Sequence, residues 1–408
     1  MRRLLAILLA ATLTLAYANE IEIFSWWAGD EGPALEALIE VFEARYPGVT
    51  VDNATVTGGA GVVARAVLRT RMLGGDPPDS FQVHAGDSII QTWVVAGRME
   101  DLTFLFEQEG WLDVFPQDLI DLISTPDGIW SVPVNIHRSN IMWYVPANLE
   151  AWGIEAPQTW DAFLDVCPAI QAEGVTPLAL GEAWTQLHLW ESVALGVLGP
   201  DRYSQLFTGE LPFNDPAAVA VWERFGEVLA CTNADAAGLS WQQATDMVVD
   251  GEAAFNIMGD WAAGYMATTL ELEPGVGFGW APSPDTAGVF MLLSDSFGLP
   301  VGAPDRENAI NWLRVLGSAE GQDTFNPIKG SISARLDSDM SLYNAYLQSA
   351  ASDFASDRQV GSLAHGAVGS DPFRNDIYLA LDIFLDTGNA QAAANAAFAV
   401  AQQYGIGR

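Results

Sequence analysis

Strand-like and helix-like segments alternate over the first hundred residues of the chain. The strand-like segments are rich in β-branched and aromatic residues, and the helix-like segments have apolar residues three and four positions apart. Strands are predicted at 21–26, 49–56 and 80–84, and helices at 31–46, 62–73 and 88–98. Alternation of this kind predicts an α/β lobe, in which helices cover both faces of a mostly parallel sheet.

The pattern changes after residue 128, where we expect a second lobe. Further strands are predicted at 128–137, 140–146, 251–258 and 288–298, a largely helical stretch at 159–249 with a break at 177–181, and further helices at 306–317, 342–354, 376–387 and 391–404. The length of 408 residues is typical of two or three domains. Because no flexible linker separates the lobes, we expect ordered crossovers and a hinge between them.

The N-terminus has the three-part pattern of a secretory signal peptide. Two arginines follow the first Met, an apolar run continues at 4–15, and Ala16-Tyr17-Ala18 is a small-x-small cleavage site. We therefore expect cleavage after Ala18 and a periplasmic mature protein. In an oxidising compartment Cys167 and Cys231 can form a disulfide, and two buried free thiols are the alternative.

Composition and motifs exclude several classes of function. Asp and Glu number 52 against 17 Lys and Arg, so the net charge of -35 repels nucleic acids. The sequence has no nucleophile elbow, P-loop, strict dinucleotide-binding motif or zinc-protease motif, and the loose glycine pattern at 59–64 is interpreted as a turn. The four histidines are too scattered to predict a metal site. The many Asp and Glu residues do not exclude a catalytic pair of carboxylates, so a secreted glycoside hydrolase is the enzyme alternative.

Aromatic and polar side chains gather at the ends of the predicted strands. In open α/β sheets, ligands bind beyond the carboxyl ends of the strands. The residues at these positions are Trp26, Trp27, Glu31, Gln82, His84, His137, Asp260, Trp261 and Asp295. The apolar face of a sugar ring stacks on indole, while its hydroxyls donate to and accept from polar side chains. This set of residues therefore predicts a sugar site.

These residues also have interpretations that need no ligand. Trp26 and Trp27 point to opposite faces if the strand continues through them, so one of them would fill the core. The histidines could be hydrogen-bonded core residues. Asp295 lies in an apolar strand, where a carboxylate needs either a protein partner or a ligand.

Lysine usage singles out one further residue. The chain has 16 arginines but a single lysine, Lys329. An ammonium group is a compact point charge with three donors, and a planar guanidinium does not replace it. We therefore interpret Lys329 as a required contact rather than a surface residue without consequence.

Six longer runs of residues coincide with these positions. They are Glu-Ile-Phe-Ser-Trp-Trp at 22–27, Gly-Gly-Asp-Pro-Pro-Asp at 74–79, Pro-Val-Asn-Ile-His-Arg at 133–138, the run from Gly251 to Trp261, Ser-Asp-Ser-Phe-Gly at 294–298 and Asn-Pro-Ile-Lys-Gly at 326–330. Through them the chain resembles the extracellular solute-binding proteins, family 1, of bacterial ABC sugar importers. The resemblance is strongest to the glucose/galactose/mannose-binding type.

The resemblance implies a type II periplasmic binding protein, with two lobes and interrupted sheets around a central cleft. It implies an N-terminal lobe of 19–132 and 295–331, and a C-terminal lobe of 133–294 and 332–408. Hinge crossings are implied near 130–137, 293–297 and 330–335. The implied sugar-contacting positions, of which Trp241 and His365 come mainly from the resemblance, are Trp26, Trp27, Glu31, Gln82, His84, His137, Trp241, Trp261, Asp295, Lys329 and His365.

The predicted function is non-enzymatic sugar transport. We expect a periplasmic protein that binds glucose, galactose or mannose between its lobes and delivers the sugar to the transmembrane subunits of an ABC permease. A monomer without cofactor or metal is expected. Because the volume of a cleft cannot be predicted from sequence, a disaccharide or an oligosaccharide is the alternative ligand.

Overall fold

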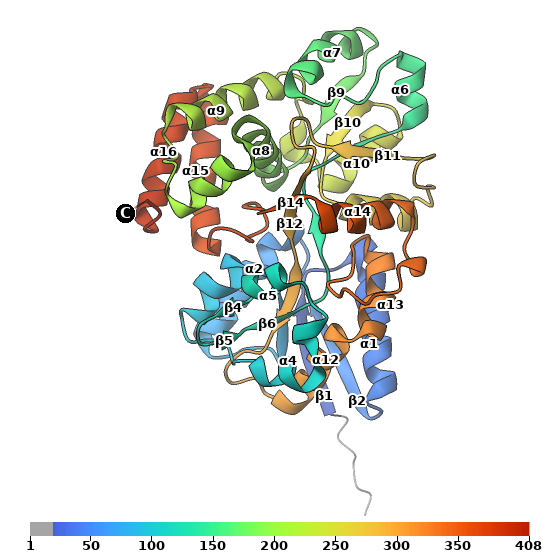
Figure 1. Ribbon diagram of the computed structural model, residues 1–408, viewed down its shortest axis with the longest axis vertical. Coiled ribbons are helices and arrows are strands. Elements are labelled where there is room, and N and C mark those ends of the chain that lie inside the picture. Colours follow the sequence, from blue (N-terminus) through green and yellow to red (C-terminus); the bar gives the residue numbers. More distant parts are fainter. Residues whose placement is uncertain (1–18, 408) are drawn as a thin grey trace, which may run out of the picture.

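Two α/β lobes lie end to end along the long axis of the molecule, with a small sheet between them (Figure 1). The computed structural model describes residues 19–407, so the predicted signal peptide at 1–18 lies outside the described residues. The predicted two-lobed α/β fold is confirmed. Within 19–407, no helix is both long enough and apolar enough to cross a lipid bilayer.

The first lobe, lower in Figure 1, is built on a five-stranded sheet. Its strand order is β2 (Val49–Thr55), β1 (Asn19–Ser25), β3 (Ser80–His84), β13 (Asp295–Gly298) and β6 (Ser131–Pro133). Strand β1 is parallel to β2 and β3, as predicted, whereas β13 is antiparallel to both of its neighbours. The helices of this lobe are α1 (Gly32–Arg45), α2 (Val62–Gly74), α3 (Asp87–Ile89), α4 (Thr103–Glu109), α5 (Gln117–Leu122), α12 (Arg306–Gly317) and α13 (Ala319–Lys329).

The second lobe, upper in Figure 1, has a four-stranded sheet. The strand order is β11 (Gly279–Pro282), β8 (Ile141–Tyr144), β10 (Ala253–Ile257) and β9 (Thr176–Ala179). The surrounding helices are α6 (Pro146–Trp152), α7 (Trp160–Ala172), α8 (Ala183–Thr208), α9 (Pro216–Leu229), α10 (Trp241–Val249), α11 (Trp261–Gly264), α15 (Asp371–Thr387) and α16 (Ala390–Gln403). The predicted helical stretch at 159–249 therefore contains α7, α8, α9 and α10, with β9 at the predicted break and a kink at Gly199 within α8.

A three-stranded sheet joins the two lobes. It contains β14 (Arg358–Gly361), β12 (Val289–Leu293) and β7 (His137–Arg138), and α14 (Ala345–Ser356) lies beside it in Figure 1. The strand predicted at 288–298 is two strands, because the chain leaves this sheet after Leu293 and enters the sheet of the first lobe at Asp295. This change of sheet brings a carboxylate to the boundary between the lobes.

One helix prediction is wrong, and five helices, α4, α5, α6, α11 and α13, were not predicted. The segment predicted as one helix at 88–98 is the short α3 followed by a π-helical turn, Ile90–Val94. Helix α13 was not predicted, because it contains Pro327 near its end and proline is a strong helix breaker. Packing of α13 against α1 and α12 stabilises the helix in spite of this residue. The difference matters because Lys329 is the last residue of α13.

The two cysteines form a disulfide. Cys167, in α7, is bonded to Cys231, which follows α9, and the two Cα atoms are 6.2 Å apart. The bond closes a segment between residues 64 apart in sequence. It ties together two helices of the second lobe, away from the boundary between the lobes.

Removal of this disulfide should lower stability without changing ligand binding. In the chain-entropy model, a loop of this length is worth about 4 kcal/mol. We expect the Cys167→Ser/Cys231→Ser variant to unfold at a lower urea concentration than the wild-type protein, and a reducing agent to lower the wild-type midpoint equally. Equal urea midpoints for the oxidised wild type and the double variant would contradict the assignment.

Candidate ligand-binding site

A cavity of about 370 Å³ lies between the two lobes. Elements of both lobes and of the joining sheet contribute side chains to it. Its walls are formed by Trp26, Trp27, Glu31, His84, His137, Trp241, Trp261, Leu293, Asp295, Lys329 and His365. Every sugar-contacting position implied by the resemblance is in this set except Gln82, and Leu293 is the one member that the sequence did not suggest. An apolar residue at the end of an apolar strand carries no local signal of a ligand site.

Two consecutive tryptophans form one wall of the cavity. Strand β1 ends at Ser25, so the strand alternation that would send Trp26 and Trp27 to opposite faces does not apply. The Trp27 ring packs against Phe325 and Phe297, with centroids 4.8 and 5.7 Å away. The Trp26 ring lies edge-on to His84 at 5.1 Å. Both indoles therefore line the cavity, and core phenylalanines hold the ring of Trp27.

Gln82 lies behind the cavity and connects two of its walls. Its side-chain oxygen accepts hydrogen bonds from the Ser25 hydroxyl at 2.7 Å and from the Trp26 backbone N–H at 3.1 Å. Its amide nitrogen donates to Oδ1 of Asp295 at 2.8 Å. Direct contact of Gln82 with a ligand thus stays a prediction, whereas its contacts fix the tryptophan segment relative to Asp295.

Asp295 is buried and held on both carboxylate oxygens. Oδ1 accepts from Gln82, and Oδ2 accepts from the Asn135 amide nitrogen at 2.9 Å. The Asn135 side-chain oxygen in turn accepts from the Asp295 backbone N–H at 2.7 Å. Burial alone would raise the pKa of this carboxyl, but interactions with His84, His137 and Lys329 outweigh burial and lower it. Asp295 is therefore an ionised acceptor in the cavity wall.

Lys329 reaches the cavity from the end of α13. Its Nζ is 2.8 Å from Oε1 of Glu31 and 3.4 Å from Nε2 of His137. Burial would lower the pKa of Lys329, but the carboxylates of Glu31 and Asp295 raise it, so the ammonium stays charged. The interpretation of the only lysine as an exposed surface residue is wrong, because the structure buries it among these groups.

His137 is oriented by a second buried carboxylate. Its Nδ1 makes a short hydrogen bond with Oδ1 of Asp260, whose other oxygen accepts from the Arg138 backbone N–H at 2.9 Å. Since Asp260 holds the proton on Nδ1, Nε2 of His137 is the acceptor that faces Lys329.

Two glycines allow the lysine-bearing helix to approach this centre. A Cβ atom on Gly264 would lie 2.4 Å from the Lys329 carbonyl oxygen, and one on Gly330 would lie 2.4 Å from the Gly264 nitrogen. Gly330 also has φ of +80°, which favours glycine. The end of α13 therefore packs backbone to backbone against α11, which carries Trp261.

All four histidines of the chain lie in or next to the cavity. Burial lowers the pKa of His84 to about 3, that of His188 to about 4 and that of His365 well below its usual value. These three imidazoles are therefore neutral near pH 7. His188 was not selected from the sequence, although its spacing of three from Glu191 places the two on one helix face.

His188, Glu191 and His365 are the residues within 19–407 that could hold a metal ion. One ligand atom from each lies within 4.8 Å of the other two. However, Glu191 already accepts four hydrogen bonds, and Nδ1 of His188 is 3.0 Å from Nε2 of His365. A metal would have to replace these interactions, so the donor set fits a hydrogen-bonded cluster better than a metal centre.

The sequence matches a family model over most of its length. Residues 27–323 match the model of the bacterial extracellular solute-binding proteins. The chain belongs to this family. A solute-binding protein of this kind holds its ligand between two lobes, which is where the cavity lies.

Individual relatives cover nearly the whole solute-binding protein. An uncharacterised ABC transporter extracellular-binding protein of Pyrococcus horikoshii is 35% identical over 88% of this chain and 82% of its own. A probable sugar-binding periplasmic protein of Brucella suis is 31% identical over 91% of this chain and 90% of its own. Among solved structures, a bacterial solute receptor with a preference for β-D-galactopyranose superposes with a TM-score of 0.83 at 19% identity, covering 96% of this chain and all of that one. This last likeness shows the shared fold.

Proposed function

We propose that the protein is the periplasmic sugar-binding component of an ABC importer, with a monosaccharide of the glucose, galactose or mannose type as its ligand. The observation that carries the proposal is the composition of the cavity wall. Four indoles line the same cavity as two carboxylates, one ammonium and three imidazoles. Indole suits the apolar face of a pyranose, and the polar groups suit its hydroxyls. The name of the Brucella relative supports a sugar as the ligand class.

The lobe boundaries expected from the resemblance, 19–132 with 295–331 and 133–294 with 332–408, are part of the proposal. The separation of β12 from β13 into different sheets supports a crossing near 293–297. Ligand contacts from both lobes would favour a closed state that the permease subunits recognise.

A longer sugar is the second candidate, because an open groove of about 730 Å³ adjoins the cavity. The groove shares Trp26, Glu31 and Trp241 with it. Across the groove, the Gln242 amide donates to Oδ1 of Asp30 at 3.0 Å. That hydrogen bond spans the first and second lobes at the edge of the cavity. A second sugar ring in the groove would have to break it.

The hydrolase alternative rests on Glu31 and Asp295, the two carboxylates of the cavity. Burial raises the pKa of Glu31, while Asp295 has a lowered pKa, and glycosidases use carboxyl pairs with opposite shifts. However, Glu31 is paired with Lys329, and both oxygens of Asp295 accept amide hydrogen bonds. These contacts favour binding over proton transfer to a substrate.

A titration of tryptophan fluorescence tests the proposed function. The protein beginning at Asn19, refolded to remove bound sugar, is titrated with glucose, galactose, mannose, xylose and maltose. We expect a saturable change with a hexose monosaccharide, because its ring stacks among the cavity indoles. Maltose should bind more weakly, because its second ring would have to break the hydrogen bond between Gln242 and Asp30. Tighter binding of maltose would favour the second candidate, and release of glucose from maltose would favour the hydrolase.

A further inference from the structure

A buried carboxylate behind the cavity holds two ligand-bearing segments together. Oε2 of Glu191, on α8, accepts from the backbone N–H groups of Leu363 and Ala364 at 2.7 and 2.9 Å. Oε1 accepts from the hydroxyls of Ser362 and Ser139 at 2.8 and 3.0 Å. Residues 362–364 lead directly into His365, and Ser139 follows the segment that carries His137. Glu191 therefore connects both segments to the part of α8 that precedes the kink at Gly199.

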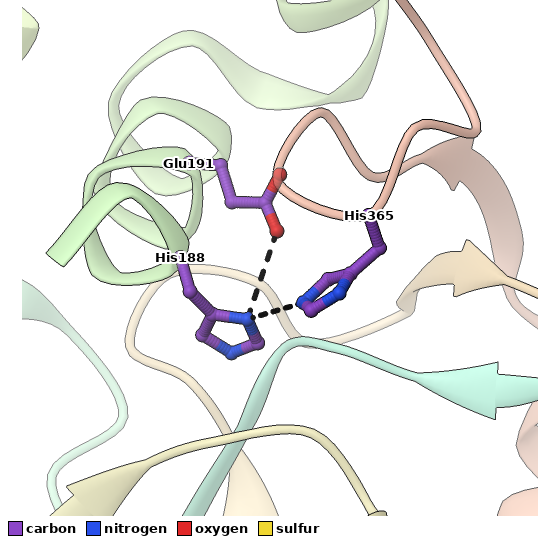
Figure 2. Close-up of side chains that lie close together, drawn as sticks. All are labelled: His188, Glu191 and His365. Carbon is purple, nitrogen blue, oxygen red and sulfur yellow. Dashed lines mark hydrogen bonds and ion pairs between the residues drawn. The ribbon is translucent and has the colours of Figure 1, made fainter. Parts of the chain in front are cut away.

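His188 lies one helical turn before Glu191 and contacts the ring of His365. Figure 2 shows both α8 side chains directed toward the loop that carries His365. Nδ1 of His188 is 3.0 Å from Nε2 of His365, and the rings are nearly perpendicular at 76°. His188 is fully buried and does not line the cavity, whereas His365 does. His188 is thus placed to act on a ligand only through His365.

The surroundings of His188 decide which ring carries the shared proton. When two neutral imidazoles meet through one nitrogen of each ring, only one of these two nitrogens carries a proton. Burial raises the pKa of Glu191 to about 7. In its ionised form Oε1 of Glu191, 3.9 Å from Nδ1 of His188, favours a proton on that nitrogen. His188 is therefore the donor and Nε2 of His365 the acceptor.

We propose that His188 is a positioning residue that fixes His365 in the tautomer with its proton on Nδ1, so that His365 offers an N–H donor to a ligand hydroxyl. Within residues 19–407, Nδ1 of His365 has no hydrogen-bond partner, which leaves it for the ligand. This inference deepens the proposed sugar-binding function and rests on it for the identity of the ligand. The hydroxyl that meets His365 must accept a hydrogen bond, so the His188 contact contributes to the choice between sugars that differ at one hydroxyl.

The tautomer can be measured without any ligand. With only four histidines, a protein labelled with ¹⁵N-histidine gives four sets of two-bond ¹H–¹⁵N correlations, assigned by single substitutions. We expect His188 and His365 both to carry their proton on Nδ1 and to be unaffected by a metal chelator. A proton on Nε2 of His365, or histidine signals that change on chelation, would overturn the proposal, and this readout stays valid even if no sugar binds.

Variants at position 188 connect the tautomer to affinity. His188→Leu removes the donor, whereas the side-chain amide of His188→Asn keeps a donor close to the position of Nδ1. For the preferred sugar we expect about a tenfold loss of affinity in His188→Leu and a loss within about threefold in His188→Asn. Ser192→Ala, also buried on α8, is the matched control and should bind as the wild type does. Equal losses in the Leu and Asn variants, or none in either, would overturn the proposal.

Discussion

Asp295→Asn should reduce sugar affinity by about 100-fold, a loss of about 2.7 kcal/mol. The asparagine has nearly the shape of aspartate, but one of its two terminal groups is a donor. Gln82 presents a donor to one carboxylate oxygen and Asn135 presents a donor to the other. Neither side-chain amide can rotate by 180° without losing a hydrogen bond. The Gln82 oxygen accepts from the Trp26 backbone N–H, and the Asn135 oxygen accepts from the backbone N–H of residue 295. An asparagine at 295 therefore meets a donor whichever way it turns.

Calorimetric titration measures this loss, and urea unfolding accounts for any change in the fold. The unsatisfied donor should also lower stability by about 1–3 kcal/mol. Asp52→Asn is the matched control, because Asp52 is exposed on β2 and makes no contact with the cavity. If the Asp295→Asn variant is fully folded and binds with wild-type affinity, Asp295 does not contact the sugar.

Lys329→Met should weaken binding by roughly 30- to 150-fold, or about 2–3 kcal/mol, because it removes a buried charged donor. Methionine fills a volume similar to that of the lysine stem but leaves the carboxylate of Glu31 without its cation. Lys329→Arg should not restore affinity, because a planar guanidinium does not fit where a compact ammonium binds. The backbone of residue 329 cannot shift to make room, because it is packed against Gly264. Both variants are measured in the same calorimetric titration.

Arg306→Met serves as the control for the lysine variant. Arg306 forms an exposed ion pair with Glu100 at 2.6 Å, and neither residue lines the cavity. Exposed pairs of this kind contribute little to stability. The sugar affinity of Arg306→Met should equal that of the wild type.

Recovery of full affinity by Lys329→Arg would show that any cation suffices, which would contradict the interpretation of the single lysine.

Local sequence patterns predicted the parts of the fold that depend on short-range order. The strands and helices up to His84 lie close to their predicted bounds because their apolar spacing matches their burial. The change of sheet between Leu293 and Asp295 was missed, since a continuous apolar run carries no sign that it serves two sheets. Helix α13 was missed because tertiary packing, rather than local propensity, stabilises it around Pro327.

The cavity was anticipated better than the contacts that support it. Trp26, Asp295 and Lys329 stood out because their chemistry is unusual for their position in the sequence. His188 and Glu191 act from a helix far away in sequence, and only the fold brings them to His365. Gln82 holds Asp295 from behind and is not among the residues that line the cavity, so its direct contact with a ligand stays a prediction.

A crystal structure of the protein beginning at Asn19, grown with its preferred monosaccharide, would show whether this cavity is the sugar-binding site. We expect one pyranose in the cavity, with its apolar face on an indole and its hydroxyls within hydrogen-bond distance of Asp295 and Lys329. His365 should approach a hydroxyl through Nδ1. A sugar bound only in the neighbouring groove, or anywhere without contact to Asp295 and Lys329, would show that the cavity is not the sugar-binding site.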